Sequence, residues 1–150
     1  MRLVALGLNQ RTAPVEVREK ISVGKESIRR GLENLYEYDG LREAVVLSTC
    51  NRTEIYAVVA EGCEGAAREF FADLTGGVEV GKYLYEYGGE ESVRHLLEVA
   101  ASLDSLVLGE GQILSQVKEA YRLAREVGAT STILNTLFHR AIAAGKLVRA

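Results

Sequence analysis

Two β-rich runs separated by only four residues constrain this fold most strongly. Residues 43–49, Glu-Ala-Val-Val-Leu-Ser-Thr, and residues 54–60, Glu-Ile-Tyr-Ala-Val-Val-Ala, are rich in the β-branched and aromatic side chains typical of strands. Because only residues 50–53 connect them, the two runs are expected to pair as an antiparallel hairpin. The hairpin places Cys50 in the connection, where a thiol can be exposed.

The other elements before residue 90 predict an α+β fold with a ferredoxin-like antiparallel sheet and helices on one face. Hydrophobic patterning and turn residues predict, in chain order, a strand at 2–9, a helix started by Thr12 and Pro14 and ending near Ile21, a helix at 25–36, the hairpin, a helix at 66–74 and a weaker strand at 82–87. This order of strand, helices, strand, strand, helix and strand is the basis of the prediction.

From Glu90 onward the pattern indicates only helices. One apolar stripe contains Val93, Leu96, Leu97, Ala100 and Ala101, and a second contains Ile113, Val117, Ala120, Tyr121 and Ala124. The expected last helix, at 132–150, reaches the final residue without a glycine cap, a proline or a polar tail. This ending suggests a helix that is cut short.

Composition excludes several classes of protein. The 150 residues are 47% hydrophobic and 26% charged, which suits one folded domain and excludes dominant disorder. No apolar run approaches the roughly 20 residues of a membrane span, and the first residues do not resemble a secretion signal, so a cytoplasmic location is expected. The net charge of −3 disfavours a protein whose main function is to bind nucleic acid. Residues 111–150, with 6 basic and 2 acidic groups, suit either a solvated helix face or a surface for a polyanion.

The two cysteines offer different chemistry. They form no disulfide framework and no CxxC pair, and no metal site is expected. The nucleophilic form of cysteine is the thiolate, which Arg52 and the turn amides could favour at Cys50. The alternative is that Cys50 is a small apolar filler at the end of the sheet. Glu61 and Glu64 flank Cys63, so we expect Cys63 to be inert.

Two groups of polar residues in the helical part of the chain, after residue 90, are candidates for a binding site. His95 lies almost opposite the apolar stripe of its helix, so it is expected to lie outside the core, either on the surface or over a site. Residues 104–112, with Gln116 one turn later, bring a carboxylate, a hydroxyl and amides to a helix entrance, where they could bind an amino acid or cap the helix. The Gly109-x-Gly111 pair is not a dinucleotide-binding fingerprint.

Three segments together resemble one known family. Residues 7–16 (GLNQRTAPVE), 47–56 (LSTCNRTEIY) and 103–114 (LDSLVLGEGQIL) closely resemble motifs of glutamyl-tRNA reductase. The resemblance covers the family's N-terminal catalytic domain and implies that its NADPH-binding and dimerisation domains are absent from this chain. It implies a catalytic domain at 1–131 and, at 132–150, the start of the long linker helix that joins the domains. Two positions depart from the family pattern: Ser102 stands where glycine is usual, and Gln10 where many members have histidine.

The resemblance also implies roles for particular residues. Cys50 would attack the ester of glutamyl-tRNA to form a thioester, which NADPH then reduces to glutamate-1-semialdehyde in tetrapyrrole synthesis. His95 matches a histidine important for activity, and Arg52 would pair with the glutamyl carboxylate. The expected substrate-binding residues are Thr49, Asn51, Arg52, Ser105, Glu110, Gly111, Gln112 and Gln116. NADPH would be bound outside this chain, which contributes no cofactor-binding or metal-binding residue.

The expected partners are glutamyl-tRNA, a second copy through the dimerisation domain, and the downstream glutamate-1-semialdehyde aminomutase. Two other functions remain open from the sequence. A non-catalytic helper would bind tRNA or a reductase through the basic helices of residues 111–150. A small-molecule regulatory module of ferredoxin-like shape would bind glutamate without reaction at Cys50.

Overall fold

The predicted hairpin forms one side of a sheet whose pairings among the described residues are all antiparallel. A computed structural model describes residues 1–102 and 112–149 of the chain. The strands are β1 (Arg2–Asn9), β2 (Leu41–Ser48), β3 (Arg52–Val59) and β4 (Tyr85–Gly88), in the spatial order β2-β3-β1-β4. β1 pairs with both β3 and β4, and β2 pairs with β3. The α+β class and the ferredoxin-like strand order are therefore confirmed.

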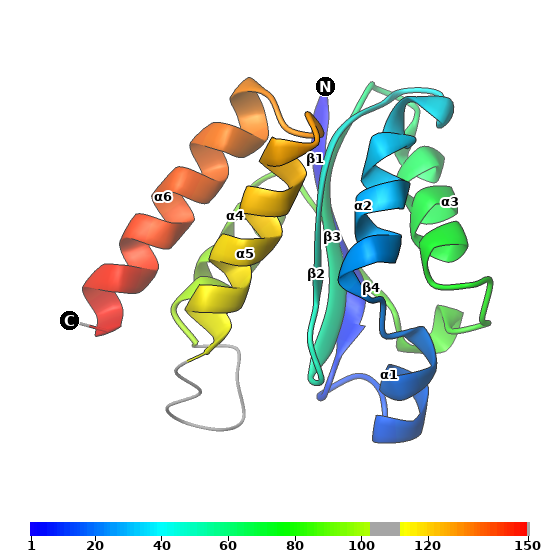
Figure 1. The fold of residues 1–150 in the computed structure, drawn as a ribbon, viewed down its shortest axis with the longest axis horizontal. Helices are drawn as coiled ribbons and strands as arrows, with labels where there is room; N and C mark the ends of the chain where they lie inside the picture. Colours follow the sequence, from blue (N-terminus) through cyan, green and yellow to red (C-terminus); the bar gives the residue numbers. More distant parts are fainter. Residues whose placement is uncertain (103–111, 150) are drawn as a thin grey trace.

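Helices cover both faces of this sheet (Figure 1). The helices that lie between strands in the chain are α1 (Val15–Ile21), α2 (Lys25–Glu33) and α3 (Glu64–Leu74), with short 3-10 turns at Leu35–Glu37 and Gly81–Tyr83. α2 and α3 lie against one face. The later helices α4 (Glu90–Ala100), α5 (Ile113–Glu126) and α6 (Thr132–Arg149) lie on the opposite side of the sheet. The sequence predicted these later helices but not the face that they cover.

Burial along β3 shows how completely the sheet is enclosed. All eight residues of this strand are buried, although successive side chains point to opposite faces. Phe70 and Phe71 contribute from α3, and Leu134 and Phe138 from α6, to one connected apolar core. The described residues therefore close both halves of their core with their own helices, as expected of a unit that folds independently.

The helix starts differ in detail from the sequence expectations. Thr12 does not cap α1, because its hydroxyl oxygen accepts a hydrogen bond from the amide of Asn9, and Pro14 precedes the helix without a capping side chain. α6 begins with help from a distant residue. Glu43, buried on β2, accepts hydrogen bonds from the amides of Ser131 and Leu134 at 2.8 and 2.9 Å. Its carboxylate satisfies two amides that a helix start leaves unpaired.

Candidate active site

The turn between β2 and β3 presents Cys50 to solvent. The hydroxyl oxygen of Thr49 accepts hydrogen bonds from the amides of Asn51 and Arg52 at 3.1 and 3.2 Å. The amide of Thr49 donates to the carbonyl of Arg52 at 2.7 Å, which closes the turn. Cys50 is a free, exposed cysteine at the tip. These turn amides thus bond to Thr49, and Thr49 has a structural task beside its predicted contact with substrate.

Arg52 lies at the start of β3, two residues beyond Cys50, and its side chain is buried. Its Nη1 donates a hydrogen bond to Oε2 of Glu54 at 3.4 Å, and the two side chains are 3% and 1% exposed. Residues 52 and 54 project from the same face of the strand. The ion pair of Arg52 and Glu54 therefore lies in the interior, between the turn that holds Cys50 and helix α4.

Glu54 is the acceptor of a buried network that the sequence did not predict. Besides Arg52, its carboxylate accepts hydrogen bonds from the Tyr56 hydroxyl at 2.9 Å, from the Tyr85 hydroxyl and from Nε2 of His95. Burial by itself would raise the pKa of Glu54, but the hydrogen bond from His95, the charge of Arg52 and the bond from Tyr85 outweigh it. The pKa is held at about 2. Glu54 is thus a buried carboxylate that stays ionised at neutral pH.

Small residues on the central strand make room for this network. In the register of the sheet, Gly7 on β1 pairs with Glu54 on one side and Tyr85 on the other. A Cβ atom at position 7 would lie 2.3 Å from the carbonyl oxygen of Thr53 and 2.7 Å from Cα of Glu54. The absence of a side chain at Gly7 therefore lets Glu54 extend toward Tyr85. In the sequence, the alternation of small and large residues at 2–9 predicted a buried strand but not this contact.

His95 is buried, so the expectation that it lies outside the core was wrong. His95 is only 6% exposed to solvent. The centroid of its ring lies 6.4, 5.2 and 4.9 Å from the ring centroids of Tyr56, Tyr85 and Tyr87, respectively. The buried face of α4 is formed by Ser92, His95, Leu96, Val99 and Ala100. The prediction from helical periodicity counted His95 as polar, so it placed the buried face of this helix on the side away from His95. In the fold, Glu54 provides the hydrogen-bond partner that makes this burial acceptable.

A surface pocket adjoins His95. It has a volume of about 360 Å³ and is lined by Arg11, Tyr87, Glu91, Arg94, His95 and Glu98. Two cationic and two anionic side chains accompany the histidine there, besides Tyr87. His95 therefore both lines a surface hollow and hydrogen bonds to the buried Glu54.

The residues predicted to bind substrate beyond the turn are only partly described. Ser105, Glu110 and Gly111 lie outside the described residues. Gln112 is exposed at the start of α5, and its carbonyl accepts a hydrogen bond from the amide of Gln116 at 2.9 Å. The turn between β2 and β3, the end of α4 and the start of α5 all lie toward the lower end of the view in Figure 1.

Gln116 lies close to the start of the thiol turn. It lines a pocket of about 190 Å³ together with Val23 and with Ser48, which is two residues before Cys50. Within the described part of the chain, its Oε1 is buried and accepts no hydrogen bond. The structure thus brings Gln116 near the hairpin end, on the side where α2 and α5 approach β2. The sequence placed Gln116 in a substrate pocket only through the family resemblance.

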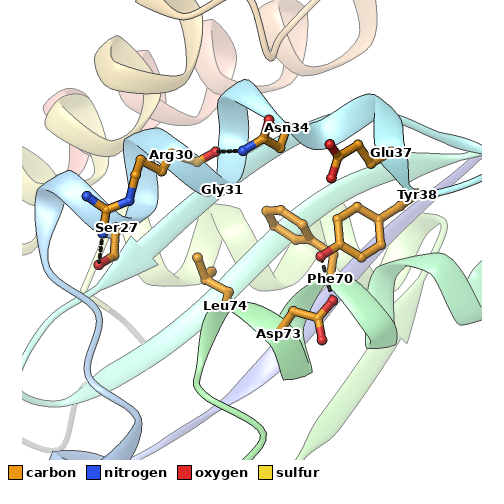
Figure 2. Close-up of a pocket in the computed structure, with 9 residues that line it drawn as sticks. All are labelled: Ser27, Arg30, Gly31, Asn34, Glu37, Tyr38, Phe70, Asp73 and Leu74. Atoms are coloured by element: carbon orange, nitrogen blue, oxygen red, sulfur yellow. Dashed lines mark hydrogen bonds between the residues drawn. The ribbon is translucent and has the colours of Figure 1, made fainter.

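Another hollow, between α2 and α3, contains none of the described residues predicted for the site (Figure 2). It has a volume of about 380 Å³. One wall is closed by the hydroxyl of Tyr38, which donates to Oδ2 of Asp73 at 2.6 Å. The Tyr38 ring packs edge to face against Phe70, with centroids 5.4 Å apart. Arg52, Glu54 and His95 lie elsewhere, where β3 meets α4.

Residues 1–102 and 112–149 lack two other kinds of feature. No three His, Cys, Asp or Glu side chains in these ranges are grouped to hold a metal ion. None of the helices there has the length and apolar character needed to span a membrane.

Comparison with known proteins identifies the family. The family model described as the N-terminal domain of glutamyl-tRNA(Glu) reductase matches residues 6–150. The chain belongs to this family. The predicted resemblance is therefore confirmed for nearly the whole chain.

Individual members of the family agree with this assignment. A glutamyl-tRNA reductase of Synechococcus sp. (strain WH7803) is 49% identical over 155 residues, covering 100% of this chain and 35% of that protein. A glutamyl-tRNA reductase of Pelotomaculum thermopropionicum is 47% identical and covers 99% and 34%. The solved glutamyl-tRNA reductase from Methanopyrus kandleri superposes with a TM-score of 0.79 at 36% identity, covering 98% of this chain and 34% of that one. The chain thus spans about a third of the length of these relatives.

Proposed function

We propose that this member of the N-terminal domain family is the catalytic domain of a glutamyl-tRNA reductase, with Cys50 as its nucleophile. The observation that carries the proposal is the exposed thiol at a turn fixed by Thr49, two residues before an arginine held by a buried carboxylate. The matching relatives are named glutamyl-tRNA reductase, which supplies the substrate class.

The proposed first step is transfer of the glutamyl group from tRNA to sulfur. The Cys50 thiol loses its proton, and the thiolate attacks the carbonyl carbon of the aminoacyl ester. A carbon–sulfur bond forms, the carbon–oxygen bond to the terminal ribose breaks, and the ribose oxygen takes up a proton. The products are a glutamyl thioester and free tRNA. No redox change occurs in this step, so it needs no cofactor.

The substrate contacts proposed for this step combine opposite charges. Arg52 would bind the glutamyl side-chain carboxylate, since guanidinium and carboxylate form charge-assisted hydrogen bonds. Glu110 would face the α-ammonium group, with Thr49, Asn51 and Gln116 among the neighbouring contacts. Ser105, Gly111 and Gln112 complete the proposed pocket. Selection of glutamate would follow from a basic group and an acidic group at opposite ends of the ligand.

Reduction of the thioester to glutamate-1-semialdehyde requires a hydride, which we propose comes from NADPH. The described residues do not fit that cofactor, because their sheet is antiparallel rather than the parallel βαβ unit typical of dinucleotide binding. We therefore assign no hydride-transfer step to them. A separate NADPH-binding domain, a homodimer, contact with the aminomutase and a domain boundary at residues 131–132 all remain proposals.

The test is to mix the chain with glutamyl-tRNA, quench in acid and measure the mass of the peptide containing Cys50. A glutamyl adduct that is absent with uncharged tRNA supports the proposal. Cys50→Ser should abolish the adduct and the slow hydrolysis of glutamyl-tRNA, whereas the matched variant Cys63→Ser should retain both. Equal loss in the two variants would contradict the assignment. Salt-sensitive tRNA binding without an adduct would instead favour the helper function.

A further inference from the structure

The carboxylate of Glu54 joins groups from three elements of the fold. Four described side chains donate to it: Arg52 and Tyr56 from β3, Tyr85 from β4, and His95 from α4. Leaving a charge buried is costly unless it is paired and hydrogen bonded, and this arrangement satisfies both conditions. Burial and the charge of Glu54 also hold the pKa of Tyr56 well above its usual value, so Tyr56 remains a donor. Glu54 therefore only accepts in this network.

This network determines which nitrogen of His95 carries the proton. An ionised carboxylate has no proton to give, so the contact between Oε2 of Glu54 and Nε2 of His95 requires a hydrogen on Nε2. In neutral imidazole the other nitrogen, Nδ1, is then an acceptor. Among the described residues, no group hydrogen bonds to Nδ1. The three tyrosine rings packed around His95 limit rotation of its ring.

The same carboxylate holds Arg52, which follows Cys50 by two residues in the chain. Arg52 and His95 both contact Oε2, so Glu54 fixes the position of this cation and of an imidazole that lines the surface pocket of Arg11 and Arg94. A proton taken up at Nδ1 would produce an imidazolium whose charge is balanced by Glu54. This is the arrangement by which a carboxylate orients a histidine for proton exchange in other enzymes.

We propose that Glu54 is the positioning residue of this site: it holds His95 as the Nε2–H tautomer and Arg52 on the same face, leaving Nδ1 as the nitrogen that exchanges a proton. In the glutamyl transfer, this orientation of His95 and Arg52 supports the reaction at Cys50, so loss of the Glu54 carboxylate slows the transfer. This second statement rests on the proposed function, whereas the tautomer of His95 does not.

The experiment combines two measurements on the 150-residue chain. Nitrogen-15 NMR of the histidine rings at mildly alkaline pH reports which nitrogen of His95 carries hydrogen, with His95→Gln assigning the signals. Single-turnover transfer from glutamyl-tRNA to Cys50 reports the reaction, and alkylation of Cys50 by iodoacetamide reports access to the thiol. The variant is Glu54→Gln. Its matched control is Glu43→Gln, which neutralises a carboxylate that is also buried, on the neighbouring strand, and that bonds α6 instead.

We expect hydrogen on Nε2 in the unmodified chain and a mixture of tautomers in Glu54→Gln, because an amide can donate as well as accept. Transfer should slow by about 10- to 100-fold in Glu54→Gln, while alkylation changes less than about twofold. Glu43→Gln should alter neither the tautomer nor the transfer rate.

Hydrogen on Nδ1 in the unmodified chain would overturn the proposal, and this result requires no folded variant. Unchanged tautomer and transfer in a folded Glu54→Gln would overturn it as well. Absence of any adduct in the unmodified chain would defeat the proposed function, and the NMR result would still decide whether Glu54 orients His95.

Discussion

Gly7 lies between Glu54 and Tyr85 in the sheet, paired in register with both, and the Tyr85 hydroxyl crosses this gap to hydrogen bond with the Glu54 carboxylate. A residue without a side chain on the central strand is thus the condition for a buried polar contact between its two neighbours. The hydrogen bond between Tyr85 and Glu54 in the candidate site therefore depends on glycine at position 7 of β1.

Gly7→Ala should therefore destabilise the chain strongly. The added methyl group would lie 2.3 Å from a backbone oxygen, which cannot move without distorting the sheet. We expect a loss of about 3 kcal/mol or more in the free energy of unfolding, measured by urea denaturation. Gly24→Ala is the matched control, because a Cβ there has no atom within 4 Å and the φ of −75° suits alanine. Similar stability of Gly7→Ala and the parent chain would contradict the close approach.

The low pKa of Glu54 predicts a specific loss of stability in acid. The carboxyl group has a pKa of about 2 when folded, against an ordinary value of 4.5, so its contribution to stability is present above pH 4.5 and is lost as the pH falls toward 2. The shift corresponds to about 3 kcal/mol. Urea denaturation from pH 7 to pH 2 should show the stability difference between the parent chain and Glu54→Gln shrinking by about this amount. A difference that does not change with pH would contradict the prediction.

Local patterns predicted the strands and their order, whereas the polar network arose from contacts that no local pattern contains. The short connection at 50–53 and the alternation along residues 2–9 were sufficient for the hairpin and the central strand. The prediction placed His95 outside the core because helical periodicity considers only the polarity of each side chain. It does not include a hydrogen-bond partner on another element, which here is Glu54 on β3. Glu54 received no role in the sequence analysis because its donors come from β4 and α4 as well as from its own strand. Glu43 illustrates the same limit, since it caps a helix that begins 89 residues later.

Thr49→Ala should weaken the turn and slow the proposed reaction. Its hydroxyl oxygen accepts from the amides of Asn51 and Arg52, and loss of these bonds should cost about 1 kcal/mol of stability. Glutamyl transfer to Cys50 should slow because the thiol is no longer held in one orientation. Thr49→Ser keeps the hydroxyl and should retain both properties, as measured by urea denaturation and single-turnover transfer. Equal defects in the two variants would show that the methyl group, rather than the hydroxyl, matters.

Glu43→Ala tests the long-range cap of α6. The Oε1 atom accepts from the amides of Ser131 and Leu134, which would lose their buried partner in the variant. Because unsatisfied buried amides and loss of a negative charge at a helix start both cost free energy, we expect destabilisation by about 2–3 kcal/mol in urea denaturation. Hydrogen exchange should accelerate first in the opening turn of α6. Glu33→Ala, at an exposed position in α2, should change stability by less than about 0.5 kcal/mol. If the two variants were equally stable, the link between β2 and α6 would contribute little to the fold.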